Sequence, residues 1–85
     1  MGTPTAVVTG ANSGIGRATT LAFAQAGYHV FGTVRGLEKA DKLLAKATSL
    51  SLADRLTLVE MDVADSASVT KGFAQIYAAT DQVDV

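Results

Sequence analysis

The sequence predicts an α/β fold: a partial, doubly wound parallel sheet covered by helices. Three observations support this prediction. Short runs of β-branched and apolar residues alternate with longer segments of helical composition. The helical segments are long enough to serve as the crossovers that connect parallel strands. The first apolar run leads directly into a loop that contains three glycines. The expected order is strand–helix–strand–helix–strand–helix, followed by the start of a fourth strand.

The first half of the chain supplies the clearest strand–helix–strand unit. Residues 5–9 (TAVVT) are apolar at successive positions, which suits a strand that is covered on both faces. Residues 15–26 have helical composition, and Gly27 is expected to end this helix in a left-handed conformation. Residues 28–34 (YHVFGTV) form the second predicted strand. The apolar face of the first helix is expected to consist of Ile15, Ala18, Ala22 and Ala26.

The second half repeats the alternation. Residues 35–50 are predicted to form a helix, residues 56–61 a strand and residues 66–80 a third helix with Asp65 as its N-cap. Residues 82–85 (QVDV) look like the start of a fourth strand. The expected apolar stripe of the second helix is Ala40, Leu43, Leu44 and Ala47, and its solvated side carries Lys39, Lys42 and Lys46. The expected stripe of the third helix is Val69, Phe73, Ile76, Tyr77 and Thr80.

Composition restricts the classes of partner. The chain has 85 residues, which is one small domain at most or part of a larger one. The formal net charge of −1 gives no electrostatic reason to expect nucleic acid or an anionic membrane as a partner. There is no cysteine, and the single histidine, His29, lies in an apolar run, where we interpret it as a strand residue and expect no metal site. No membrane-spanning run or secretory signal is visible, so we expect a soluble cytoplasmic protein.

The glycine-rich loop is the strongest functional signal. It lies where the first strand ends and the first helix begins, the place at which open α/β sheets bind ligands. A helix N-terminus offers free N–H groups and a positive dipole end to a phosphate. Gly10 is expected to permit the turn, Gly14 to let the backbone approach a pyrophosphate, and Gly16 to let the helix pack on the sheet. Asn12 and Ser13 are expected to hydrogen-bond the loop, a phosphate or a ribose oxygen. The alternative is a structural turn without a ligand.

The spacing of the motif, Thr9-Gly10-x₃-Gly14-Ile15-Gly16, differs from the usual Gly-x-Gly-x-x-Gly. It resembles the TGxxxGIG motif of the short-chain dehydrogenase/reductase family. The resemblance covers all 85 residues and includes LAFAQAGYHV after the loop and Asp62–Val63 after the third strand. It implies a Rossmann-like fold and an oxidoreductase that acts on alcohol or carbonyl substrates. It also implies that the Asp62 carboxylate binds the adenine amino group and that the Val63 backbone contacts the ring. The alternative for Asp62 is a turn former before the third helix.

The end of the second strand bears on the choice of cofactor. By the resemblance, the acidic position that selects NAD falls on Val34, and Arg35 follows it. A guanidinium suits the 2′-phosphate of NADP(H) through paired N–H donors. We therefore favour NADP(H), with NAD(H) as the other possibility. Arg17 either adds positive potential near the phosphates or faces solvent, and Arg35 is alternatively an exposed turn residue.

The family's catalytic Ser and Tyr-x-x-x-Lys have no counterpart in this sequence, since neither Tyr28 nor Tyr77 has a lysine four residues later. We therefore predict no catalytic residue, and we interpret residues 1–85 as the N-terminal portion of a truncated dinucleotide-binding domain. The first strand is expected to have an open edge and the sheet to expose apolar side chains. A small-molecule substrate and an oligomer are expected only for a full-length protein. The alternatives are a non-catalytic dinucleotide-binding or sensor module and an inactive fragment.

Overall fold

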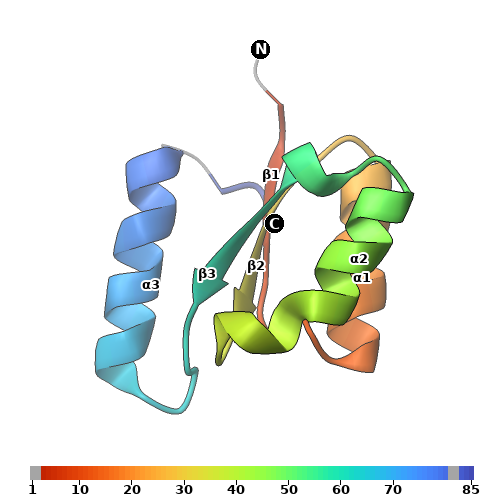
Figure 1. Ribbon diagram of the computed structural model, residues 1–85. Helices are drawn as coiled ribbons and strands as arrows, with labels where there is room; N and C mark the ends of the chain where they lie inside the picture. The colour runs from red at the N-terminus through yellow and green to blue at the C-terminus, as the bar shows by residue number, and fades with distance from the viewer. Residues whose placement is uncertain (1–2, 81–82) are drawn as a thin grey trace.

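A computed structural model describes residues 3–80 and 83–85, with only the backbone described for residues 38 and 39. Strands and helices alternate along the chain (Figure 1). The elements in order are β1 (Thr5–Val8), α1 (Gly14–Gln25), β2 (His29–Val34), the 3₁₀ turn η1 (Leu37–Ala40), α2 (Asp41–Ser49), the 3₁₀ turn η2 (Ala53–Arg55), β3 (Leu56–Glu60) and α3 (Ser66–Ala79).

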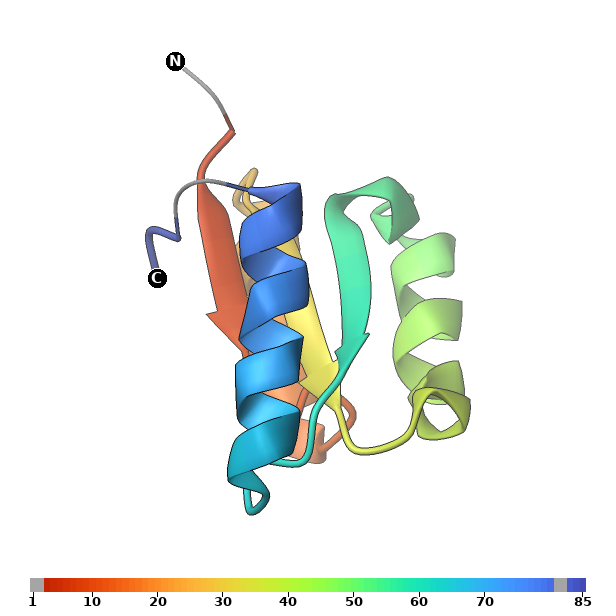
Figure 2. The same ribbon diagram turned by 90° about the vertical axis from the view of Figure 1, so that its left-hand side faces the viewer.

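The three strands form one parallel sheet in the order β1-β2-β3, which confirms the predicted fold class. Thr5 pairs with His29 at the start of β2, and Val30 pairs with Leu56 at the start of β3. Helices α1 and α2 cover one face of the sheet and α3 covers the other (Figures 1 and 2). This is the arrangement expected from right-handed crossovers that first run outward and then return across the sheet.

Two apolar clusters fill the space between the sheet and its helices. The side chains of β2 alternate between them, because successive residues of a strand point to opposite faces. Val30 and Val34 belong to the cluster under α1 and α2, and Phe31 belongs to the cluster under α3. Both faces of β2 are therefore buried, as its continuous apolar run predicts. His29 is a strand residue as predicted, and its Nε2 lies 2.8 Å from Thr57 Oγ1.

The residues predicted to start a fourth strand form no regular strand among those described, but they are hydrogen-bonded to β1. Residue 82 lies outside the described residues, and residues 83–85 have no regular secondary structure. The Val7 N–H donates to the Val85 carbonyl at 2.9 Å, and the Asp84 N–H donates to the Thr5 carbonyl at 2.9 Å. This segment therefore lies beside β1 (Figure 2), where the residues predicted to start a fourth strand meet the first strand of the sheet.

These contacts correct the expectation of an open edge and exposed sheet residues. Thr5 and Val7 of β1 are bonded to the segment 83–85, so the start of that edge is occupied. Val7 is half-buried and packs, like Val83, against the apolar cluster under α3. Among the described residues, the exposed large apolar side chains belong to helices, turns and the last residue, and none belongs to a strand.

The predicted apolar face of α1 is wrong. Ile15 is 85% exposed, and Ala18, Ala22 and Ala26 are also exposed. The buried residues of α1 are Gly16, Thr20 and Ala24, which lie on a different side of the helix. Alanines occupy several faces of this helix, so apolarity alone does not reveal which side packs. The packed side carries small residues, which suits a helix that lies close to the sheet.

The stripes of the other two helices are partly confirmed. Three of the four predicted residues of α2 are buried, and Leu44 is exposed. In α3, Ile76 is buried and Val69 and Phe73 are half-buried, but Tyr77 is 56% exposed. Gly72 of α3 is also buried, and the Met61 side chain occupies the space that a Cβ at Gly72 would need, a contact that sequence patterns do not reveal. No helix within the described residues is long and apolar enough to cross a bilayer.

The end of α1 and the start of α3 are as predicted. Gly27 has a φ of +100° and follows the last turn of α1, as a left-handed helix stop requires. Asp65 caps α3, and its Oδ1 accepts a hydrogen bond from the Ala67 N–H at 3.0 Å. The helix predicted over 35–50 instead begins with the turn η1 before α2, after Gly36 in extended conformation.

Candidate functional site

The loop between β1 and α1 turns sharply and is fastened to the neighbouring strand. Gly10 has a φ of +63°, which confirms that it permits the turn, since other residues rarely adopt this conformation. The N–H of the next residue, Ala11, donates to the Thr33 carbonyl of β2 at 3.0 Å. Ala11 is fully buried. The loop is thus held against the carboxyl end of β2.

Ser13 organises the start of α1. Its hydroxyl donates to the Gly10 carbonyl at 2.8 Å and accepts from the Gly16 N–H at 3.1 Å. Its carbonyl accepts from the Arg17 N–H at 2.7 Å. Of the alternatives for this side chain, the structure therefore shows hydrogen bonding within the loop. Ser13 is the N-cap of α1, and the capping bond fixes the shape of the loop.

Gly16 is buried and lies directly against the loop that precedes it. A Cβ at this position would collide with the Gly10 carbonyl oxygen and would lie 2.8 Å from the Gly10 carbonyl carbon. The closest approach is therefore between the first turn of α1 and its own loop. Sequence reasoning missed this contact because the loop must already be folded for the two glycines to meet.

Gly14 faces open space at the N-terminus of α1. Apart from its chain neighbours and the backbone of α1, no atom lies within 4 Å of the position that its Cβ would occupy. Ser13 provides acceptors for the N–H groups of Gly16 and Arg17, so within the described residues those of Gly14 and Ile15 have no helical acceptor. The Ile15 side chain beside them is 85% exposed. This combination leaves room and donors for an anion at the positive end of the helix dipole.

Arg35 lies at the carboxyl end of β2, directly after Val34. The Arg35 side chain is exposed, whereas Val34 is only 1% exposed and belongs to the cluster under α1 and α2. The position at which the family pattern places an acid is therefore filled by an apolar core residue. Arg35 is the charged side chain that this strand presents to solvent at its end.

Asp62 and Val63 follow β3 at the same edge of the sheet. The Asp62 Oδ1 accepts from the Ala64 N–H at 3.0 Å, and the Asp62 carbonyl accepts from the Asp65 N–H at 3.0 Å. Asp62 thus forms a turn before α3, as one of its two interpretations predicts. Val63 is 61% exposed. Because the strands are parallel, the loops that follow β1, β2 and β3 gather at one edge, the lower one in Figure 1.

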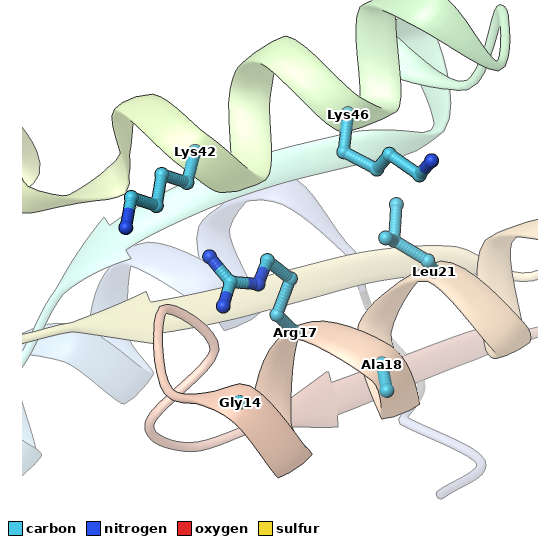
Figure 3. A pocket seen from close by; sticks show the side chains of 6 residues that line it. All are labelled: Gly14, Arg17, Ala18, Leu21, Lys42 and Lys46. Atoms are coloured by element: carbon cyan, nitrogen blue, oxygen red, sulfur yellow. The ribbon is translucent and has the colours of Figure 1, made fainter.

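A groove that the sequence did not predict lies between α1 and α2 (Figure 3). The predicted exposure of Lys42 and Lys46 is confirmed, but both side chains line this groove together with Arg17. The side chain of Lys39 lies outside the described residues. Sequence patterns do not show that Arg17, Lys42 and Lys46 line one groove, because this follows from the packing of α1 against α2. The lining residues are Gly14, Arg17, Ala18, Leu21, Lys42 and Lys46.

Comparison with known proteins gives the family. The family model described as short chain dehydrogenase matches residues 4–85. The chain belongs to the short-chain dehydrogenase family. Its similarity to farnesol dehydrogenase of Aedes aegypti is 40% identity over 80 residues, which is 94% of this chain and 32% of that relative.

Solved structures of short-chain dehydrogenases have the same arrangement of elements. The Streptomyces avermitilis short-chain dehydrogenase is 34% identical with a TM-score of 0.83, covering 99% of this chain and 29% of that protein. A metagenomic short-chain oxidoreductase in complex with NADP is 27% identical with a TM-score of 0.84, covering 96% and 36%. The chain thus spans about a third of the length of these relatives.

Proposed function

We propose that this chain supplies the NADP(H)-binding part of a short-chain dehydrogenase that interconverts alcohols and carbonyl compounds. The observation that carries the proposal is the open position at Gly14, beside two N–H groups at the start of α1. A side chain at Gly14 would fill the space that a pyrophosphate needs. Membership of the family and the NADP complex of one relative support the choice of ligand class.

Three groups of residues would hold the dinucleotide. The loop would bind the pyrophosphate, with Ser13 fixing its shape and Asn12 beside it. Arg35 would bind the 2′-phosphate, and Asp62 and Val63 would contact the adenine. When bound, the cofactor supplies hydride transfer between its nicotinamide ring and a carbonyl carbon. The loop residues proposed for the pyrophosphate are Gly10, Asn12, Ser13, Gly14, Ile15 and Gly16.

The preference for NADP(H) over NAD(H) rests on two neighbouring side chains. An acid at the end of β2 would accept hydrogen bonds from the ribose 2′-OH and repel a 2′-phosphate. The apolar Val34 provides neither effect. The exposed Arg35 guanidinium offers paired N–H donors and a positive charge instead.

Replacing Arg35 tests this preference. Arg35→Ala removes a charge-assisted contact of about 1.5–3 kcal/mol, so NADP⁺ should bind about 10- to 150-fold more weakly. The affinity for NAD⁺ should change by less than about twofold, because NAD⁺ has no 2′-phosphate. Isothermal titration with both dinucleotides measures the two changes.

Two further variants complete this experiment. Arg35→Lys keeps the charge and loses the paired donors, so its NADP⁺ affinity should fall between those of the wild type and Arg35→Ala. Lys71→Ala removes an exposed cation of α3 and should affect neither dinucleotide. Equal losses of NADP⁺ and NAD⁺ affinity in Arg35→Ala would refute the assignment of Arg35 to the 2′-phosphate.

A further inference from the structure

The groove between α1 and α2 is a second candidate site. Its volume is about 330 Å³, at the small end of the range for pockets that hold small molecules. Its apolar lining residues are Ala18 and Leu21 of α1. Three cationic side chains also line it, and one end of the groove reaches Gly14 at the start of α1 (Figure 3).

The charges of the groove are all of one sign. Arg17, Lys42 and Lys46 line it, and no acidic residue is among its lining residues. Within the described part of the chain, none of these three cations forms an ion pair. Like charges that line one open groove repel one another, and an anion between them reduces this repulsion. The chain as a whole is slightly acidic, with a net charge of −1, so this cluster is a local feature.

The geometry concentrates the positive potential at one end. In Figure 3, Arg17 from the first turn of α1 and Lys42 from the first turn of α2 extend toward each other across the gap. Lys46 lies farther along the groove, above Leu21. Because α1 and α2 follow parallel strands, both helices begin at the same end of the sheet. The positive dipole end of α1 adds to the field there, whereas the Asp41 carboxylate in the first turn of α2 offsets part of the contribution of that helix.

We propose that Arg17 and Lys42 bind a phosphate-type dianion at the Gly14 end of this groove. A guanidinium offers paired donors to two oxygens of a tetrahedral anion, and an ammonium offers a compact charge to a third. Lys46 adds long-range attraction. The groove exceeds the size of a bare phosphate and therefore leaves room for part of the group that carries it.

Two sources of phosphate share this chemistry. One is the 2′-phosphate of an NADP(H) molecule held by the adjacent loop, and this source rests on the proposed function. The other is a free phosphate-bearing compound that binds independently of the dinucleotide. If the 2′-phosphate of NADP(H) binds there, Lys42 and the groove contribute to the preference for NADP(H) over NAD(H). If a free phosphate-bearing compound binds there, the groove is a separate site.

Inorganic phosphate is the probe that tests the site. In ¹H–¹⁵N spectra of the chain, phosphate should cause saturable shifts at the amides of Gly14, Arg17 and Lys42, relative to chloride at equal ionic strength. Arg17→Gln and Lys42→Gln should each weaken phosphate binding by about fivefold or more, and Lys46→Gln should weaken it less. Lys71→Gln, on α3, is the matched control and should leave the affinity unchanged.

Repeating the titration with saturating dinucleotide separates the two sources. If NADP⁺ but not NAD⁺ abolishes the phosphate shifts, and Lys42→Gln weakens NADP⁺ alone, the 2′-phosphate occupies the groove. If the phosphate shifts persist with NADP⁺ bound, the site is a separate one. Either result supports the proposal. Non-saturable shifts, or equal effects of Lys42→Gln and Lys71→Gln, would overturn it. If neither dinucleotide binds, the proposed function fails while the phosphate titration still decides this inference.

Discussion

Single residues at the start of α1 determine the shape of the loop. Ser13 bonds to both Gly10 and Gly16, and the first turn of the helix lies directly against the Gly10 carbonyl. The two later glycines of the motif therefore have separate functions. Gly16 is needed to close the loop, whereas Gly14 leaves the space in front of it open.

This difference gives a prediction for Gly16→Ala. The new Cβ would collide with backbone atoms of Gly10, which cannot move without opening the loop. We expect a loss of about 1–3 kcal/mol in the free energy of unfolding, as for other overpacked sites. Thermal unfolding followed by circular dichroism measures the loss. Ala24→Gly removes a methyl group from the same helix, and its unfolding is compared with that of Gly16→Ala, which adds one. A wild-type melting temperature for Gly16→Ala would contradict the close contact with Gly10.

At the scale of elements, helix ends are set by local chemistry. The N–H of Gly27 donates to the Ala24 carbonyl at 3.1 Å and that of Tyr28 to the Phe23 carbonyl at 3.0 Å. This is the bonding pattern of a Schellman motif. The rings of Phe23 and Tyr28 pack edge to face, with their centroids 4.9 Å apart. Arg55 adds a bond from its Nη1 to the Ala24 carbonyl at 3.0 Å.

Gly27→Ala is expected to destabilise the chain through the backbone alone. No atom lies within 4 Å of the position of a Cβ there, so the change introduces no clash. The positive φ of +100° is unfavourable for any side chain, and we expect a cost of about 1–2 kcal/mol. Urea unfolding with an unchanged m-value measures this cost. Gly27→Asn should lose less, because asparagine tolerates positive φ better, and equal losses for both variants would argue against this explanation.

Element order, the end of α1 and the cap of α3 are predictable from the sequence, whereas the start of α2 and the packed faces of the helices are less so. The signals for strands, for Gly27 and for Asp65 are local, so they can be read without a tertiary structure. The alanines of α1 do not identify its packed side, and the burial of Gly72 depends on Met61, which lies outside α3. The groove at Arg17 and Lys42 depends on two helices meeting, which no single pattern encodes.

At the scale of the whole molecule, the parallel sheet brings the candidate site together. Three loops from separate parts of the chain meet where the carboxyl ends of the three strands lie. The two apolar clusters hold α1, α2 and α3 on the sheet. The motif residues, Arg35 and Asp62 all follow strands that end at this edge. The site is therefore a consequence of topology, while the choice of ligand depends on the side chains placed there.

Titration of the wild type and of Gly14→Ala with NADP⁺ and NAD⁺ tests the central claim most directly. Because nothing but its chain neighbours and the backbone of α1 lies within 4 Å of the position of a Cβ at residue 14, the variant should fold as stably as the wild type. The methyl group would occupy the space proposed for the pyrophosphate, so both dinucleotides should bind at least about tenfold more weakly. Wild-type affinity in a folded Gly14→Ala variant, or a wild-type chain that binds neither dinucleotide, would contradict the account.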